Sequence, residues 1–253
     1  MTDIPHQLRR GAISLVDIDE SGFLRWLKLV GHIYGIPTAP HYLRRAEGKI
    51  PRWRRILEPK AAFSTVRILE VRLENQEVMF RAGPGLRMRG KEIALCLRES
   101  ELASMSIVTM GPEADSFDHR LREEDPTIAK LFKSYGWFCL RSAMRGVSEK
   151  VEEMARRHGL AITSPVHPGG PLDKWGKANQ KTLFSIIDAG FTGVTLNRDG
   201  SMTPSLTISY IIGLGSSLRE TKGKPSDTQC LTCSNARCPG KKALAILEKE
   251  GFS

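Results

Sequence analysis

The 253-residue sequence predicts a mixed α and β fold, because helix-like and strand-like stretches occur in separate blocks along the chain. Residues 20–34 place Phe23, Leu27 and Val30 three or four positions apart, which is the spacing of a helix with one apolar face. Residues 64–73 alternate in part between apolar and polar side chains, as a half-buried strand does. The composition, 40% hydrophobic and 26% charged, is that of a folded protein with a core.

In the first half of the chain, prolines and glycines separate the expected elements. Pro37 and Pro40 interrupt the first helix, and both faces of the strand at 64–73 carry apolar residues. Further expected elements are a short basic helix or turn at 51–59, a strand at 78–80, a loop at 83–85, a helix at 91–97 and a strand at 104–110.

The second half begins with a helical pair. Residues 112–124 and 126–145 carry apolar side chains three and four positions apart, and the second helix continues to His158, where Gly159 can end it. The rest is richer in loops. It contains a helix at 177–188, a strand at 193–196, a turn at 197–200, an apolar stretch at 204–213 and a short helix at 242–251.

The sequence shows no membrane span or secretion signal. No apolar run approaches the roughly 18 residues that a membrane helix needs, and the first residues, MTDIPHQLRRG, lack the apolar core of a signal peptide. We therefore expect a cytoplasmic protein. Five cysteines in a chain of this length do not make a disulfide scaffold, and clustered cysteines in a reducing compartment indicate metal or redox chemistry.

The charge balance is strongly basic, with 38 Lys and Arg against 28 Asp and Glu and a net charge of +10. Such an excess can be a solvated surface, or it can attract nucleic acid, an anionic cofactor or an acidic protein. Aromatic residues make up only 7% and do not alternate with the basic residues, so a stacking platform for single strands is not indicated. The sequence also lacks RNP-like and paired zinc-finger patterns, which disfavours nucleic acid as the main partner.

The strongest chemical signal is the segment CLTCSNARCP, which contains Cys230, Cys233 and Cys238. Thiolates at this spacing can wrap one soft metal centre, because a tight turn brings their sulfurs to one side, and the basic residues nearby would stabilise them. We expect an iron–sulfur centre ahead of zinc, with the fourth ligand open, and uncomplexed thiols are the alternative. Cys96 and Cys139 lie in apolar contexts that indicate small buried thiols.

Two further segments are candidates for ligand contacts. The loop at 167–171 reads HPGGP, and its composition alone favours a structural turn before the helix at 177, although its two glycines would also let the backbone approach a cofactor closely. The stretch at 202–213 alternates small hydroxyl residues, which could bond a ligand or pair within a sheet. The candidate cofactor-binding residues are therefore His167, Pro168, Gly169, Gly170, Pro171, Met202, Pro204, Ser205, Thr207 and Ser209.

Taken in order, several segments resemble the reactivation domain of cobalamin-dependent methionine synthase. The loop, helix and strands of that family are similar to the run SPVHPGGPLDKWGKANQKTLFSIIDAGFTGVTLNRDGSMTPSLTISYIIGLG. Upstream, IVTMGPEADSFDHRL resembles its strand-to-helix passage A-T-L-G-x-x-x-D, and KLFKSYGWFCLRSAMRGVSEKVEE resembles its long following helix. The ending C-x2-C-x4-C-P resembles small stand-alone members that carry a cysteine tail. The resemblance covers roughly residues 45–245.

The resemblance implies an α+β fold in which helices flank a twisted antiparallel sheet. It also implies three regions along the chain. These are a helical N-terminal extension at 1–45, a domain similar to the activation domain at 46–215, and a basic linker with the cysteine tail at 216–253.

Two departures from the family pattern concern S-adenosylmethionine. The family grips this molecule with R-x-x-P-G-Y-P at the loop, whereas here Ser164 and Pro165 lie near the arginine position and Gly170 takes the tyrosine position. The acid of its L-T-E-S strand is missing at Asn197, although Asp199 could replace it with a shifted spacing. The resemblance therefore implies corrinoid association more strongly than S-adenosylmethionine binding.

The function that the resemblance implies is an accessory or reductive reactivation subunit of a corrinoid-dependent methyltransferase system, in which the cysteine centre relays an electron to Co(II). The implied partners are a corrinoid protein or cobalamin-dependent methyltransferase, and a flavodoxin- or ferredoxin-like electron donor. Whether the chain is itself an enzyme stays open, and the sequence contains no P-loop, GxGxxG or GxSxG motif. The alternatives are a non-enzymatic metal-binding adaptor that docks an acidic partner, and a basic nucleic-acid module.

Overall fold

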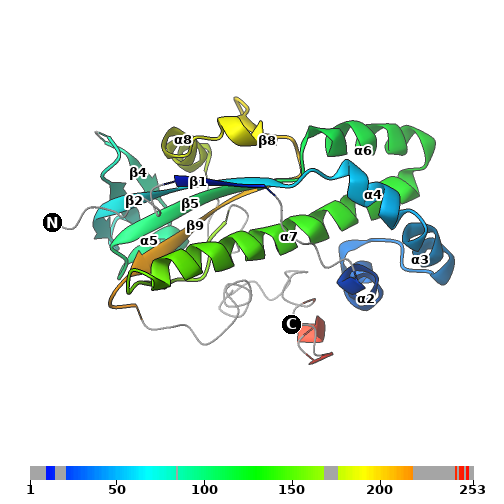
Figure 1. Cartoon of the computed structure of the whole chain (residues 1–253), viewed down its shortest axis with the longest axis horizontal. Helices are drawn as coiled ribbons and strands as arrows, with labels where there is room; N and C mark the ends of the chain where they lie inside the picture. The colour runs from blue at the N-terminus through cyan, green and yellow to red at the C-terminus, as the bar shows by residue number, and fades with distance from the viewer. Residues whose placement is uncertain are drawn as a thin grey trace.

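Figure 1 shows the computed structural model, in which a sheet runs through the middle of the molecule. The long helix α7 (Pro126–Arg156) lies along one face of this sheet, and helix α8 (Lys177–Ile186) lies over the other face. The expected α+β fold, a twisted antiparallel sheet flanked by helices, is thus confirmed. The structure describes residues 10–14, 21–83, 85–167, 176–218 and, near the C-terminus, 243, 245–247, 249 and 250.

Seven antiparallel strands form the main sheet, in the order β4-β3-β2-β5-β9-β6, with β1 paired to β2. A separate two-stranded ladder joins β7 to β8. The strands are β1 (Arg10–Ser14), β2 (Lys60–Arg72), β3 (Glu77–Phe80), β4 (Arg87–Arg89), β5 (Leu102–Thr109), β6 (Ala161–Ile162), β7 (Thr195–Leu196), β8 (Met202–Thr203) and β9 (Thr207–Gly215).

Helices cover both faces of the sheet and one end of the molecule. Besides α7 and α8 they are α2 (Ser21–Val30), α3 (Pro40–Glu47), α4 (Ile50–Ile56), α5 (Lys91–Leu97) and α6 (Pro112–Glu124), with short 3-10 turns η1 (Gly31–Tyr34) and η2 (Gly190–Thr192). None of the helices within the described part of the chain is long and apolar enough to cross a membrane.

The sheet separates two hydrophobic cores. One lies between the sheet and α7, with α2, α3, α4 and α6 packed around it, and its largest buried side chains include Trp53, Phe132, Tyr135 and Tyr210. The other lies between the opposite face and α5 with α8. Every residue of β5 is buried, because this central strand has a core on each face. Its sequence, LASMSIVT, therefore contains only apolar residues and small hydroxyl residues, with no charged side chain on either face.

Helix α7 begins and ends at local sequence signals. The Asp125 carboxylate accepts the backbone N–H groups of Thr127 and Ile128, both at 3.1 Å, and Pro126 occupies the first turn, where its missing N–H costs nothing. The bond from Ile128 is the main cause that lowers the pKa of Asp125. Beyond the last turn, Gly159 has a φ of +71°, a conformation that favours glycine at a helix end.

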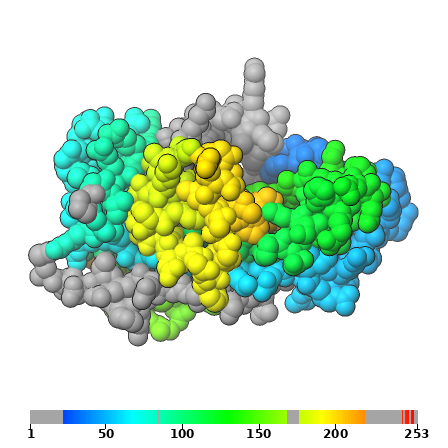
Figure 2. All heavy atoms as spheres, turned by 90° about the horizontal axis from the view of Figure 1, so that it is seen from above, coloured from blue at the N-terminus to red at the C-terminus, as the bar shows by residue number. Residues whose placement is uncertain are grey.

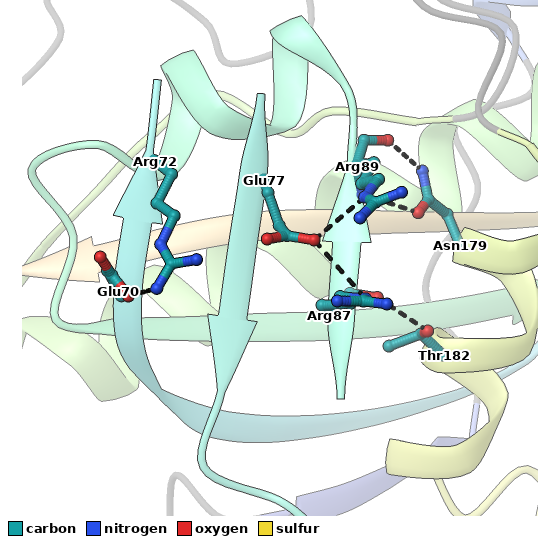
Figure 3. A network of polar contacts seen from close by, with 7 residues as sticks. All are labelled: Glu70, Arg72, Glu77, Arg87, Arg89, Asn179 and Thr182. Atoms are coloured by element: carbon teal, nitrogen blue, oxygen red, sulfur yellow. Dashed lines mark hydrogen bonds and ion pairs between the residues drawn. The ribbon is translucent and has the colours of Figure 1, made fainter. Parts of the chain in front are cut away.

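Helix α8 covers the open edge of strand β4 (Figure 3). The Asn179 Oδ1 accepts the backbone N–H of Arg89 at 2.9 Å, and its Nδ2 donates to the carbonyl oxygen of Arg89 at 2.6 Å. The Thr182 hydroxyl donates to the carbonyl oxygen of Arg87 at 3.0 Å. These bonds take the place of a further strand, so an edge that would otherwise template pairing with another chain is covered.

The next residue of α8 bonds to a strand much further along the sheet. The Gln180 Oε1 accepts the hydroxyl of Ser209 on β9 at 3.0 Å. Three strands separate β4 from β9 in the sheet order. One helix can therefore bond to both only because the sheet curls around it. A register shift between Ile68 and Glu70 of β2 contributes to this curl, since a bulge bends the strand that carries it.

Two arginines of β4 also enclose a carboxylate on the neighbouring strand. The Glu77 side chain is only 6% exposed, and its Oε1 lies 3.0 Å from the Nε of Arg89 and 3.5 Å from the Nε of Arg87. A buried carboxylate needs such partners. Both guanidinium groups are more than half exposed, so the pairs add little stability and chiefly orient β4.

The structure differs from the sequence-based expectation mainly near the N-terminus. Residues 10–14 form strand β1, because they pair with residues 60–64 of β2, whereas a helical segment was expected there. The helices α2 and α3 share the core of α7 and the sheet, so they do not stand apart as an extension. Strand β4 was not expected, whereas α2 and α3 agree with the helical segment expected at 1–45, and near the C-terminus Ala243, residues 245–247 and Lys249 are helical, as expected for 242–251.

We predict that Asn179→Ala lowers the free energy of unfolding by about 1–3 kcal/mol, because it removes two hydrogen bonds from the covered edge of β4 and leaves Arg89 backbone groups unpaired. Urea denaturation followed by circular dichroism measures the change. The control is Lys181→Ala on the exposed side of the same helix, which should change the value by less than about 0.5 kcal/mol. Equal stability of the two variants would contradict the role of the Asn179 clamp.

Candidate functional site

The two segments expected to contact a cofactor meet at strand β9. Met202 lies on β8, and the segment then turns through Pro204 and Ser205 into the start of β9. On the far edge of β9, the backbone of Val166 pairs with that of Ile211 through two bonds of 2.9 Å. His167 follows Val166 directly and is half-buried. Of the segment 167–171, His167 therefore lies near the strand that carries the other candidate residues.

Helix α8 brings the chain back to the same strand. The helix begins at Lys177, and its residue Gln180 bonds to Ser209. Val166 thus lies beside Ile211, and Gln180 lies beside Ser209 on the same strand. Pro168, Gly169, Gly170 and Pro171 lie outside the described residues, so their contact with a cofactor stays a prediction.

The buried hydroxyl groups of β9 bond within the protein. The Thr207 hydroxyl donates to the Oγ1 of Thr109 on β5 at 2.8 Å, and the Ser209 hydroxyl donates to Gln180. Both side chains are buried, so their hydroxyls shape the floor of the site and are not directly exposed to a ligand. The sequence left open whether these hydroxyls bond a ligand or pair within the sheet, and in the structure those of Thr207 and Ser209 bond within the protein.

Ser205 is exposed and joins β9 to helix α6. Its backbone N–H donates to the Oδ2 of Asp115 at 2.7 Å, and its hydroxyl donates to the Oδ1 at 2.6 Å. Asp115 lies in the first turn of α6, directly after the sharp turn at Gly111. Gly111 has a φ of +86°, and a Cβ there would lie 3.0 Å from the Cβ of Glu58, so this turn requires glycine. Figure 2 shows orange atoms of this region at the surface between the yellow α8–β8 segment and the green helix α6.

Sequence reasoning did not single out Asp115 as a site residue. A signal was present, because the aspartate ends the passage MGPEAD that follows a buried strand. Its partner Ser205, 90 positions further along the chain, was singled out from its own segment. Only the fold shows that the two belong together.

The hairpin between β7 and β8 forms the rim beside α8. Asn197 donates from its Nδ2 to the Oγ of Ser201 at 2.9 Å and to the Oγ1 of Thr203 at 3.0 Å. The Asp199 carboxylate accepts the hydroxyl and backbone N–H of Ser201, which lower the pKa of Asp199. A Cβ at Gly200 would lie 3.2 Å from that of Lys177, so the turn rests against the start of α8. Asp199 is thus held by its own turn.

The cysteines divide into two groups. Cys139 is buried in α7, as expected. Cys96 is half-buried as a residue, but its sulfur is enclosed and lies 3.0 Å from the Oγ1 of Thr163. Burial raises the pKa of the Cys96 thiol to about 11. The expected metal ligands Cys230, Cys233 and Cys238 lie outside the described residues, and elsewhere in the described chain no three His, Cys, Asp or Glu side chains form a metal site.

Comparison with solved structures shows a protein that shares this fold. No family model and no curated protein sequence matches the chain. The crystal structure of the MetH reactivation domain bound to AdoHcy has a TM-score of 0.60 and 11% sequence identity to this chain, and the match covers 85% of this chain and 81% of that one. The two proteins share a fold. This confirms the architecture that the sequence resemblance implied, at an identity too low to transfer ligands or partners.

We predict that Cys96 and Cys139 do not react in the folded protein. At pH 8 a thiol with a pKa of about 11 is thiolate in only about one molecule in a thousand, and Cys139 is buried. Titration with a chromogenic disulfide reagent after treatment with a chelator should give the same number of fast-reacting thiols for the wild type and for the Cys96→Ser, Cys139→Ser variant. A loss of one or two fast thiols in the variant would contradict this assignment.

Proposed function

We propose that this chain is an accessory subunit that reactivates a corrinoid-dependent methyltransferase by delivering one electron to its cobalt. The observation that carries the proposal is the fold shared with the MetH reactivation domain. Five sequence segments that resemble that family in the same order support it as well. Those segments include the loop at 167–171 and the stretch at 202–209, and the described residues that flank the loop, Val166 and Gln180, bond to Ile211 and Ser209 of β9.

The chemistry assigned to the complex is simple. Cobalamin-dependent methyl transfer cycles through Co(I), which occasionally loses one electron and becomes inactive Co(II). Reactivation takes one electron from a flavodoxin- or ferredoxin-like donor, which reduces Co(II) to Co(I). In this proposal, the segments 167–171 and 202–205 contact the corrinoid that a partner protein presents, and the buried Thr207 and Ser209 shape the floor of the site. The bonds of Ser205 to Asp115 and of Ser209 to Gln180 hold this site in one shape.

A corrinoid protein is a better candidate ligand than S-adenosylmethionine. The MetH domain was crystallised with AdoHcy, which is chemically related to S-adenosylmethionine. In this chain the polar side chains near the family's acid position are engaged locally, since Asn197 bonds to Ser201 and Thr203, and Asp199 bonds to Ser201. The family's loop arginine and tyrosine are also replaced.

We predict that the protein binds a cobalamin-loaded corrinoid protein more tightly than free S-adenosylmethionine, as measured by titration calorimetry with each. Ser205→Trp places a bulky ring on the exposed start of β9 and should raise the Kd for the corrinoid protein at least about tenfold, which corresponds to 1.4 kcal/mol. Lys150→Trp, on α7 on the opposite side of the sheet, is the control and should leave the Kd unchanged. Tight binding of S-adenosylmethionine alone would reverse the proposed order.

The cysteine tail is the proposed electron relay. An iron–sulfur centre held by Cys230, Cys233 and Cys238 would supply one-electron transfer, whereas zinc at the same residues would supply none and would favour the adaptor alternative. Strand β9 ends at Gly215, and the Glu101 carboxylate accepts the backbone N–H and the hydroxyl of Ser216 at 2.9 and 2.6 Å, so β9 is complete before the tail begins. Truncation after Leu218 therefore keeps these contacts.

We predict that truncation after Leu218 leaves a folded protein that still binds the corrinoid protein but no longer supports Co(II) reduction, followed by the absorption of the corrinoid. Replacement of Cys230, Cys233 and Cys238 by Ser in the full chain should abolish iron and acid-labile sulfide and give the same loss. Reduction at the full rate by the truncated protein with the same donor would exclude the relay. Bound zinc without sulfide would support the adaptor instead.

A further inference from the structure

Positive charge is concentrated at one end of the molecule. Residues 21–59 contain eight Arg and Lys but only two acidic residues, Glu47 and Glu58. Figure 1 shows the helices of this segment, α2, α3 and α4, at one end of the molecule, away from α5 and β4. The basic residues of this segment therefore give one end of the molecule a local excess of positive charge.

The helices α3 and α4 present this charge on a fixed surface. Their inner sides bury Leu43, Ala46, Ile50 and Trp53 in the core that includes α7. Their outer sides carry a set of basic side chains that we call the basic ridge, Arg44, Arg45, Lys49, Arg52 and Arg55. Because the inner sides are packed, the ridge keeps its shape without a partner.

Most of the ridge has no acidic partner within the described chain. Arg45 pairs with Asp125 at 2.6 Å, and the guanidinium of Arg52 lies 5.3 Å from the ring centre of Phe117. No ion pair joins Arg44, Lys49 or Arg55 to any described residue. Arg52 and Arg55 lie three positions apart on α4, where like charges repel. An acidic partner would offset this repulsion.

The ridge borders the candidate site. Helix α4 ends at Ile56, and two residues later the backbone N–H of Glu58 donates to the carbonyl oxygen of Met110 at 2.8 Å. Gly111 follows and packs against Glu58, and the first turn of α6 then holds Ser205 through Asp115. A protein that docks on the ridge would therefore also reach the start of β9.

The surroundings of the ridge favour a protein over nucleic acid. Trp53 is only 1% exposed, so the aromatic side chain between the arginines cannot stack on bases. Helix α6, which packs against α4, carries the exposed acidic residues Glu113, Glu123 and Glu124. These carboxylates interrupt the basic track that a phosphate backbone would follow. A bounded basic patch with an acidic border suits a complementary protein surface.

We propose that the basic ridge docks an acidic surface of the corrinoid-carrying partner and so orients the corrinoid over the start of β9. This rests on the proposed function, because it names the surface through which that partner binds. The contribution of the ridge is electrostatic. It therefore raises the association rate and weakens as salt screens the charges.

The test compares two double variants in binding a cobalamin-loaded corrinoid protein of net negative charge. Arg44→Glu with Arg55→Glu reverses the ridge, and Arg81→Glu with Lys150→Glu reverses two exposed residues elsewhere, with the same change in net charge. The ridge variant should raise the Kd at least tenfold at low salt, with a smaller difference at 0.5 M salt, and its melting temperature should not fall. The control variant should bind within about twofold of the wild type.

The outcomes separate this proposal from the function on which it rests. If the wild type binds the corrinoid protein and the ridge variant binds it equally well, the docking role of the ridge is wrong and the proposed function stands. The same conclusion follows if the control variant weakens binding as much as the ridge variant does. Absence of wild-type binding overturns both. Tighter binding of a random DNA duplex than of the corrinoid protein, lost in the ridge variant, would make the ridge a nucleic-acid surface and overturn the protein docking proposed here.

Discussion

The curl of the sheet depends on two neighbouring side chains of helix α8. Asn179 bonds to the backbone of edge strand β4, and Gln180 bonds to Ser209 on β9, with three strands between β4 and β9 in the sheet order. Both side chains are 5% exposed, so their amide groups would cost free energy if they lacked partners. A flat sheet could satisfy one of them but not both. The hydrogen bonds of these two amide groups therefore favour a sheet that curls around the core shared with α5 and α8.

The same constraint builds the candidate site. Val166 pairs with Ile211, and Gln180 in the first turn of α8 bonds to Ser209, so the described residues before and after 168–175 lie beside β9. The hydroxyls of Thr207 and Ser209 are used to make this frame. Among the predicted site residues that the structure describes, His167 is half-buried and Ser205 is exposed, and Asp115 fixes Ser205 in place.

Local signals in the sequence predict the helices better than the strands. Asp125 and Pro126 begin α7 and Gly159 follows its end, so this helix could be predicted from its own residues. Strand β4 has only three residues, and its edge is completed by Asn179, 90 positions away, so no local period marks it. The site shows the same division. Its hydroxyl residues were predicted, but their partners come from distant segments, and the cysteine tail lies outside the described residues.

Two chains with only 11% sequence identity can share this fold, because the fold restricts the residue type at few positions. Core positions need apolar volume, and a close contact needs a small residue, as at Gly136 of α7, where a Cβ would lie 2.4 Å from Leu206. Binding a particular ligand instead requires particular atoms at particular places. Exposed charge is constrained by neither packing nor strand pairing. In the basic ridge, Arg45 pairs with Asp125 and Arg52 lies over Phe117, whereas Arg44, Lys49 and Arg55 make no ion pair with any described residue, so contacts within the fold do not account for the clustering of these three charges.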